Sequence, residues 1–288
     1  MANGIYQKRV IFKRGKQSNF LLAKVKKLNI SWAIFSNKIN VNIRTLNDWK
    51  REKYSMPIDE VKKICELSNS KMPKNDQKIG CLKDPLPIKI PKFSKDLAEF
   101  TGIMLGDGGI SANQVKITTN MIDDAQYAIF IKNLIKKLFD LKPSVCPRKK
   151  DVSALDIIIS RIKLVEFCNQ KLGLHIGNKL KQGLDIPAWI RKNSEFEKAC
   201  VRGLIDTDGC VFDECHDIKG KKYNYKRLNF TSASPELIKS VFEILEKNGL
   251  SPKIKNSRQV NIENKENIKK YFKIVGTSNP KHLNRYKK

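Results

Sequence analysis

Two short stretches, about a hundred residues apart, constrain the fold of this chain more than any other feature. The first, "FTGIMLGDGG", runs from Phe100 to Gly109, and the second, "VRGLIDTDGC", runs from Val201 to Cys210. Each is an apolar stretch at helical period that ends in an Asp-Gly pair, at Asp107 and Asp208. A carboxylate at the C-terminal end of a helix opposes the helix dipole and costs roughly 0.3–1 kcal/mol. The repeated unfavourable placement indicates a function for both acids.

The segments after these stretches repeat one order of elements. A β-rich stretch leads into a helix, "DDAQYAIFIKNLIKKLF" in one half and "SPELIKSVFEILEKNG" in the other, and then into a proline-marked strand pair and a closing helix. We predict an α+β fold with tandem α-β-β-α-β-β-α modules over residues 96–195 and 196–288. A duplicated module makes one chain imitate a symmetric dimer, so we expect a monomer with internal pseudo-twofold symmetry.

Residues 1–75 are predicted to form a separate small all-α domain that begins with a basic arm. Ile34, Phe35 and Ile39 share one helical face, Asn40 to Asn42 supply a turn, and Leu46 and Trp49 anchor a second helix. This layout resembles the helix-turn-helix of phage-repressor-like DNA-binding domains, although that family usually has glycine where this chain has Asn40. The outward residues of the second helix would be Arg44, Thr45, Asn47, Asp48 and Arg51. The alternative is an ordinary helical bundle with solvated polar faces.

Residues 76–95 hold three prolines and lack amphipathic period, which predicts a linker or a strapped-down connection.

Small residues spaced by four predict how the two opening helices pack. Gly102 and Gly106 share one face of the first helix, and Gly203 and Thr207 share one face of the second. If these faces meet, Asp107 and Asp208 fall side by side at the helix ends. Two adjacent carboxylates resist ionisation without a cation. We therefore expect a hard divalent ion, Mg²⁺ or Mn²⁺, with Gly106 and Thr207 beside the two acids in the metal site.

The stretches "LAEFTGIMLGDGG" and "CVRGLIDTDGC" resemble the two motifs of the LAGLIDADG homing endonucleases, and the resemblance covers residues 95 to 288. It implies that Asp107 and Asp208 bind the metal. The first copy has Leu105 where the second has Asp206, so Asp206 is expected to be structural. The resemblance also implies a lysine at the catalytic centre. Lys179 and Lys281 each follow the acid of their half by a little over seventy residues, with Lys181 as the nearest competitor.

The hairpin after each motif helix is the predicted DNA-reading element. A two-stranded ribbon fits the major groove, where amide and guanidinium groups bind purine edges. The alternative is a solvated sheet face. The candidate readers are Asn113, Gln114, Lys116, Lys222, Asn224, Lys226 and Arg227.

Charge composition indicates the partner. A formal net charge of +28 would destabilise a compact chain by self-repulsion unless the chain binds a polyanion, which favours nucleic acid over an anionic membrane. Apolar runs long enough to span a membrane and a signal-peptide core are both missing from the sequence, so we expect no membrane partner and a cytoplasmic location. The seven cysteines lack regular spacing, and Cys210, Cys215 and His216 have no second close pair for zinc.

These observations predict a Mg²⁺-dependent, site-specific double-strand DNA endonuclease with an added helix-turn-helix. The resemblance implies that each module cuts one strand, that 3′ overhangs remain, and that the protein serves mobility of an intron or similar element. Without the nucleophile and terminal Asn of a self-splicing intein, we expect a free-standing protein. Two alternatives stay open: a non-catalytic DNA-binding transcription regulator on the same scaffold, and an RNA intron maturase.

Overall fold

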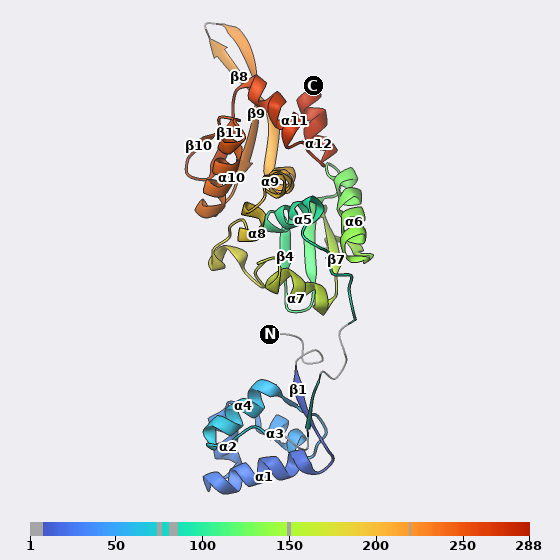
Figure 1. The fold of residues 1–288 in the computed structure, drawn as a ribbon, viewed down its shortest axis with the longest axis vertical. Coiled ribbons are helices and arrows are strands. Elements are labelled where there is room, and N and C mark those ends of the chain that lie inside the picture. Colours follow the sequence, from blue (N-terminus) through green and yellow to red (C-terminus); the bar gives the residue numbers. More distant parts are fainter. Residues whose placement is uncertain (1–7, 74–76, 81–85, 149–150, 219) are drawn as a thin grey trace. The chain divides into compact units, whose positions relative to one another are not determined.

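The computed structural model describes residues 8–73, 77–80, 86–148, 151–218 and 220–288 (Figure 1). The chain divides into two compact units, Met1–Pro85 and Leu86–Lys288. No helix within the described ranges is long and apolar enough to cross a membrane.

The N-terminal unit packs helices against a small sheet. Its buried core includes Val10, Leu21, Phe35, Leu46 and Trp49. The sheet has three strands in the order β2-β1-β3. The prediction of an all-α unit is therefore wrong. The elements are β1 (Arg9–Phe12), α1 (Lys16–Leu28), α2 (Trp32–Ile39), α3 (Ile43–Lys50), β2 (Met56–Pro57), α4 (Ile58–Leu67) and β3 (Gln77–Gly80).

Helices α2 and α3 are joined by the predicted turn. Asn40 adopts a left-handed conformation with φ of 54°, which a short polar side chain tolerates better than most, so asparagine replaces the usual glycine here. Asn42 caps α3 by accepting a hydrogen bond from the Arg44 backbone nitrogen at 2.8 Å. Phe35 and Ile39 are buried as predicted, but Ile34 is 48% exposed and takes no part in the core.

Two elements differ from the expectations for this unit. Residues 9–12, within the predicted basic arm, form the central strand of the sheet. Residues 77–80, within the predicted linker, pair antiparallel with that strand, with Ile79 opposite Val10. Backbone pairing to a distant strand overrides the weak local pattern. Residues 86–95 belong to the C-terminal unit, where Phe93 stacks on Trp189 with ring centroids 4.4 Å apart.

The C-terminal unit contains the predicted module twice. The first module has α5 (Lys95–Leu105), β4 (Gly108–Ile110), β5 (Val115–Asn120), α6 (Ala125–Phe139), β6 (Ser144–Arg148), β7 (Asp151–Ile159) and α7 (Ile162–Gln170). The second has α9 (Ser194–Asp208), β8 (Gly209–Ile218), β9 (Lys221–Thr231), α10 (Pro235–Lys247), β10 (Lys253–Lys255), β11 (Gln259–Ile262) and α11 (Lys265–Ile274). A 3-10 turn η1 (Lys179–Gln182), α8 (Ala188–Arg191) and α12 (Pro280–Lys287) complete the unit.

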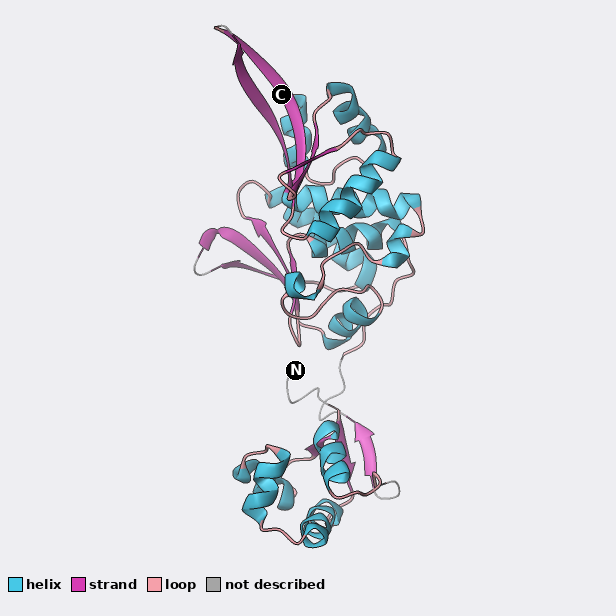
Figure 2. Ribbon diagram, turned by 90° about the vertical axis from the view of Figure 1, so that its left-hand side faces the viewer, coloured by secondary structure: helices cyan, strands magenta, loops and turns pink. Residues whose placement is uncertain are grey.

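Each module forms an antiparallel four-stranded sheet with the same topology, β4-β5-β7-β6 in the first and β8-β9-β11-β10 in the second. Burial alternates along the strands: Val115 and Ile117 of β5 are fully buried, whereas Lys116 and Thr118, each of which follows one of them, are half-buried. The helices gather on one side of both sheets, and Figure 2 shows the opposite faces uncovered. One apolar core runs through both modules.

Candidate active site

Helices α5 and α9 meet with their backbones in contact. A β-carbon on Gly102 would lie 2.1 Å from the carbonyl oxygen of Cys200, and one on Gly203 would lie 2.4 Å from that of Glu99. No real β-carbon approaches another atom this closely, so both positions require glycine. One turn later, a β-carbon on Gly106 would lie 2.1 Å from the Thr207 hydroxyl and 3.1 Å from Asp208 Oδ2. The predicted contact between the small-residue faces is confirmed by these distances.

This packing brings the two acids together. Asp107 follows the C-terminal end of α5, and Asp208 is the last residue of α9. Burial, followed by repulsion from Asp208, raises the pKa of Asp107 to about 7. Burial also raises the pKa of Asp208, and the nearby Lys179 ammonium opposes that rise. The pair therefore carries an electrostatic conflict that a cation at this point would relieve.

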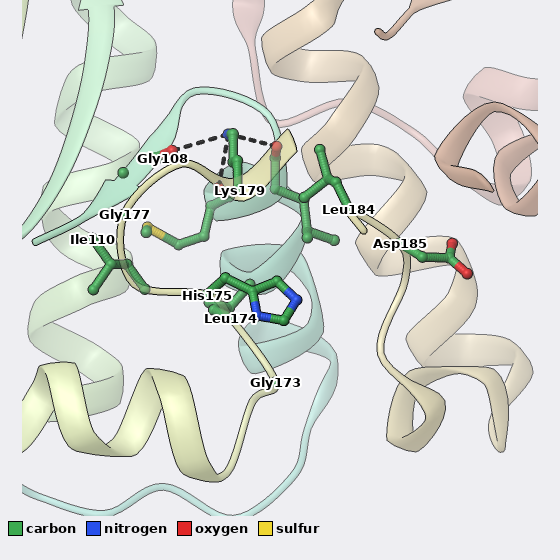
Figure 3. Close-up of a pocket in the computed structure, with 12 residues that line it drawn as sticks. Gly108, Ile110, Gly173, Leu174, His175, Gly177, Lys179, Leu184 and Asp185 are labelled. Atoms are coloured by element: carbon green, nitrogen blue, oxygen red, sulfur yellow. Dashed lines mark hydrogen bonds between the residues drawn. The ribbon is translucent and has the colours of Figure 1, made fainter. Parts of the chain in front are cut away.

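Lys179 lies at the same centre, at the C-terminal end of α5. Its ammonium donates hydrogen bonds to the carbonyl oxygens of Leu105 at 2.7 Å, Gly108 at 2.9 Å and Met104 at 3.3 Å (Figure 3). It also donates to the Gly106 carbonyl. Burial lowers the pKa of Lys179, while Asp208 and Asp107 raise it. The lysine caps a helix end whose carbonyl groups and acid are both negative.

Lys281 is held differently. It lies in the first turn of α12, directly after Pro280, and its ammonium forms an ion pair of 2.7 Å with Asp124 Oδ1. Its charge lowers the pKa of Asp107, and that of Asp124 raises it, so both groups lie within electrostatic reach of the centre. The two predicted lysines thus converge on one region, but one is bound by carbonyl groups and the other by a carboxylate. Lys181, the competitor of Lys179, follows in η1 with an exposed side chain.

Asp206 is bonded to the segment that precedes α12. It is 2% exposed and accepts hydrogen bonds from the Thr277 hydroxyl and, at 2.6 Å, from the Ser278 backbone nitrogen. These bonds give it a structural partner on the segment before α12.

The donor set at the centre suits a hard cation. Carboxylate and carbonyl oxygens are the ligands that Mg²⁺ and Mn²⁺ prefer. The described residues include no group of three or more His, Cys, Asp and Glu side chains that could enclose a metal, so the remaining ligands would be waters and phosphate oxygens. Of the other predicted ligands, the Gly106 carbonyl is engaged by Lys179, and the Thr207 hydroxyl donates to the Leu204 carbonyl at 2.9 Å.

The register of β8 and β9 divides the predicted readers between two faces. Because Leu228 and Phe230 are buried against the helices, every second residue back along β9 shares their face. Lys222, Asn224 and Lys226 therefore lie on the face shared with Leu228, opposite that of Arg227. The predicted readers of this hairpin do not share one face, and their role in reading DNA stays a prediction. Lys226 pairs there with Asp213 at 2.8 Å and donates to the Arg285 carbonyl at 2.9 Å.

The uncovered face of this hairpin carries Arg227, which forms an ion pair of 2.7 Å with Glu214. Three aromatic side chains share this face: Phe212 is 38% exposed, Tyr223 42% and Tyr225 40%. Sequence analysis missed them, although counting in steps of two from Leu228 and Phe230 would have found the tyrosines. The same register places Cys210 and His216 on this face and Cys215 on the other, which separates the three zinc candidates.

In the first module, Lys116 lies on the uncovered face as required of a reader. It pairs with Asp156 at 3.3 Å, and Asp156 also accepts from Thr118 Oγ1 at 2.8 Å and from Arg148 Nη2 at 3.2 Å. These bonds lower the pKa of Asp156. Asn113 and Gln114 lie half-buried in the turn between β4 and β5.

In the N-terminal unit, α3 presents Arg44, Thr45 and Arg51 to solvent. Asn47 differs from the prediction, because it is half-buried and its Oδ1 accepts a hydrogen bond from Trp32 Nε1 at 2.8 Å. That bond ties α3 to α2, so the side-chain oxygen of Asn47 serves packing.

Residues 195–276 match the family model of the LAGLIDADG-like domain. The chain is 28% identical over 197 residues to the reverse gyrase of Methanocaldococcus jannaschii, an overlap of 65% of this chain and 11% of that protein. It therefore spans about a tenth of that relative's length.

Three solved structures are each similar to about two thirds of the chain. A mesophilic variant of the homing endonuclease I-DmoI is 19% identical with a TM-score of 0.43, over 64% of this chain and 96% of that chain. I-SmaMI bound to uncleaved DNA with calcium ions is 10% identical with a TM-score of 0.43, over 67% and 88%. The LAGLIDADG meganuclease I-CpaMI bound to uncleaved DNA is 11% identical with a TM-score of 0.43, over 67% and 88%.

Proposed function

We propose that this chain, whose residues 195–276 match the model of the LAGLIDADG-like domain, is a site-specific double-strand DNA endonuclease dependent on a divalent metal. The observation that carries the proposal is the meeting of Asp107 and Asp208 at two helix ends, where each opposes the helix dipole and burial raises its pKa. A protein that only binds DNA gains nothing from two acids placed together near phosphates. A phosphodiesterase gains a metal site.

The chemistry follows from the groups at the centre. Asp107 and Asp208 would hold Mg²⁺ or Mn²⁺, which when bound supplies an activated water and offsets phosphate charge. Lys179 and Lys281 place ammonium groups where negative charge develops on the phosphate in the transition state. One lysine from each module would serve one strand, so that a pseudo-symmetric pair of half-sites makes the two cuts. The resemblance to homing endonucleases implies that these cuts leave 3′ overhangs.

DNA binding is supported by charge and by shape. The chain carries 57 Lys and Arg against 29 Asp and Glu. The uncovered faces of the two sheets offer Lys116 and Arg227, and α3 offers Arg44 and Arg51. Because phosphate contacts release counterions, affinity is expected to fall with salt at a log-log slope of about −5 or steeper.

The test is cleavage of a randomised library of duplex DNA by the full chain with Mg²⁺, Mn²⁺, Ca²⁺ or EDTA. We expect a recurrent sequence to be cut on both strands with Mg²⁺ or Mn²⁺ and left intact with EDTA. Specific binding without cutting under every metal would refute the nuclease and favour a transcription regulator. Selective binding of intron RNA over duplex DNA, again without cutting, would favour a maturase.

A further inference from the structure

The segment between α11 and α12, which delivers Lys281, is held by buried acids. Asp206 accepts from the Thr277 hydroxyl and the Ser278 backbone nitrogen, and Glu99 Oε1 accepts from the Ser278 hydroxyl at 2.5 Å. Glu99 is 3% exposed, and its other oxygen binds Arg202 Nη2 at 2.5 Å. Buried carboxylates therefore hold Thr277 and Ser278, which precede Lys281 in the chain.

Asp124 completes this arrangement at the lysine itself. The fully buried Asn279 donates from Nδ2 to Asp124 Oδ1 at 2.9 Å and to the Asp206 carbonyl at 3.1 Å. The same carboxylate binds the Lys281 ammonium at 2.7 Å, with only 13% and 20% of the two side chains exposed. A pair this enclosed is screened much less than a surface ion pair.

We call these contacts of Glu99, Asp124 and Asp206 with residues 277–281 the clamp. The clamp crosses the boundary between modules. Glu99 of α5 and Asp124 before α6 belong to the first module, whereas Asn279 and Lys281 belong to the second. Asp124 occupies the N-cap position of α6, and the corresponding N-cap residue of α10 is Ser234.

No equivalent clamp serves Lys179 in the described residues. Ser234 donates instead to the Leu184 carbonyl at 2.5 Å, and Leu105 stands where a twin of Asp206 would be. Lys179 relies on the carbonyl groups at the end of α5. The absence of an acid at Leu105 thus matches a difference in the structure. Among the described residues, carboxylates hold the segment that carries Lys281 but not the one that carries Lys179.

We infer that Asp124 is a positioning residue that holds the Lys281 ammonium at the cutting centre from the opposite module. The inference rests on the proposed nuclease function. A lysine side chain released from such a pair regains its rotamer freedom, which lowers the fraction of time that its ammonium is correctly placed roughly ten-fold. Because Lys179 has no contact of this kind, the loss is confined to one DNA strand.

The test is strand-resolved cleavage of the cognate duplex, with each strand labelled separately. Asp124→Asn should slow one strand roughly ten-fold and the other less than about two-fold. Asp124→Glu should restore part of the rate, and Asp123→Asn, an equal charge change at the exposed neighbouring residue, should match the wild type. Equal slowing of both strands would overturn the inference.

A double-mutant cycle shows whether Asp124 acts through the lysine. Asp124→Asn should have no further effect in a Lys281→Met background and its full effect in a Lys179→Met background. An undiminished effect in the Lys281→Met background would mean that Asp124 acts by another route.

A second measurement does not depend on cleavage. Acylation of lysines in the metal-free protein by an N-hydroxysuccinimide ester, followed by mass spectrometry, should show several-fold faster modification of Lys281 in Asp124→Asn than in the wild type or Asp123→Asn. Unchanged reactivity of Lys281 would refute the clamp even if the variant cuts poorly. If the wild type cuts no DNA, the nuclease proposal fails, and this assay still decides whether Asp124 holds Lys281.

Discussion

The two modules share one order of helices and strands, but their first hairpins differ greatly in length. Strands β4 and β5 have 3 and 6 residues, whereas β8 and β9 have 10 and 11 and extend beyond the rest of the second module (Figure 1). Their lysines also have different partners, carbonyl groups for Lys179 and a carboxylate for Lys281. The parts that match are the motif helices and their acids.

This difference separates what the duplicated scaffold must keep from what it is free to change. The helix contact and the acids have to be paired, because each half completes the other. The hairpins and lysine supports act on one half each and have diverged. We therefore expect an asymmetric DNA target, with more base pairs contacted by the second module.

The largest expected effect tests whether the acids are equivalent. Asp107→Asn and Asp208→Asn should each lower double-strand cleavage roughly 100–1000-fold, because each removes one carboxylate from a shared metal site. Binding should persist or tighten slightly, since a negative charge near phosphate is lost. Cleavage and gel-shift assays on one cognate site measure both.

Asp206→Asn is the matched control for this pair, because its carboxylate binds Thr277 and Ser278 and it should lower cleavage much less. Unimpaired cutting by either motif variant would remove the catalytic assignment. A large effect in only one of them would show that the acids are not equivalent.

The second test asks whether the helix contact is symmetric. Gly102→Ala and Gly203→Ala should each lower the free energy of unfolding by about 3 kcal/mol, because each new methyl group would overlap a backbone carbonyl oxygen. Gly109→Ala should change it by less than about 0.5 kcal/mol, since no atom lies within 4 Å of its added β-carbon. Urea unfolding of the three variants compares them directly. Losses near that of the control would argue against close contact.

The third test uses pH to compare wild-type Asp107 with its neutral replacement. The pKa of Asp107 is raised to about 7 in the folded protein, so the folded state binds more protons than the unfolded state between about pH 4 and 7. The free energy of unfolding therefore falls as pH rises through this window. In EDTA, Asp107→Asn should melt above the wild type by several degrees at pH 8 and by less at pH 5, at roughly 2–4 °C per kcal/mol.

Asp206, with its pKa also raised to about 7, contributes equally to both proteins and cancels from this comparison. Mg²⁺ should raise the melting temperature of the wild type more than that of the variant. A difference in melting temperature that does not change between pH 5 and 8 would contradict the raised pKa.

The smallest expected effect concerns the long hairpin. Arg227→Ala should relax base preference at one or two positions by about 1–3 kcal/mol, because its side chain lies on the uncovered face. Lys226→Ala, on the opposite face of the same strand, should leave the preference unchanged. Selection of binding sites from a random library for each variant provides the measurement. Similar relaxation in both would break the assignment of faces.

The sequence predicts the parts of this molecule that depend on local repetition. The Asp-Gly ends, the small residues at Gly102 and Gly203, and the order of elements all recur in both halves, so each copy supports the other. The face of Lys226 required a register that only the buried Leu228 and Phe230 define. The role of Asp124 left no local signal, because its partners Asn279 and Lys281 are far away in the chain. Strand β3 could not be predicted from the local sequence for the same reason, because it forms by pairing with the distant strand β1.

The contact at Gly102 and Gly203 also bears on how such a protein changes its target. The two helices meet backbone to backbone at these glycines, so sliding or rotating either helix would bring a residue that has a β-carbon into the contact. The separation of the two acids is therefore set inside the protein. That separation sets the stagger between the two cuts, independently of the base sequence at the site. Substitutions in the hairpins are then free to move the protein to a new sequence while the geometry of the break is inherited unchanged.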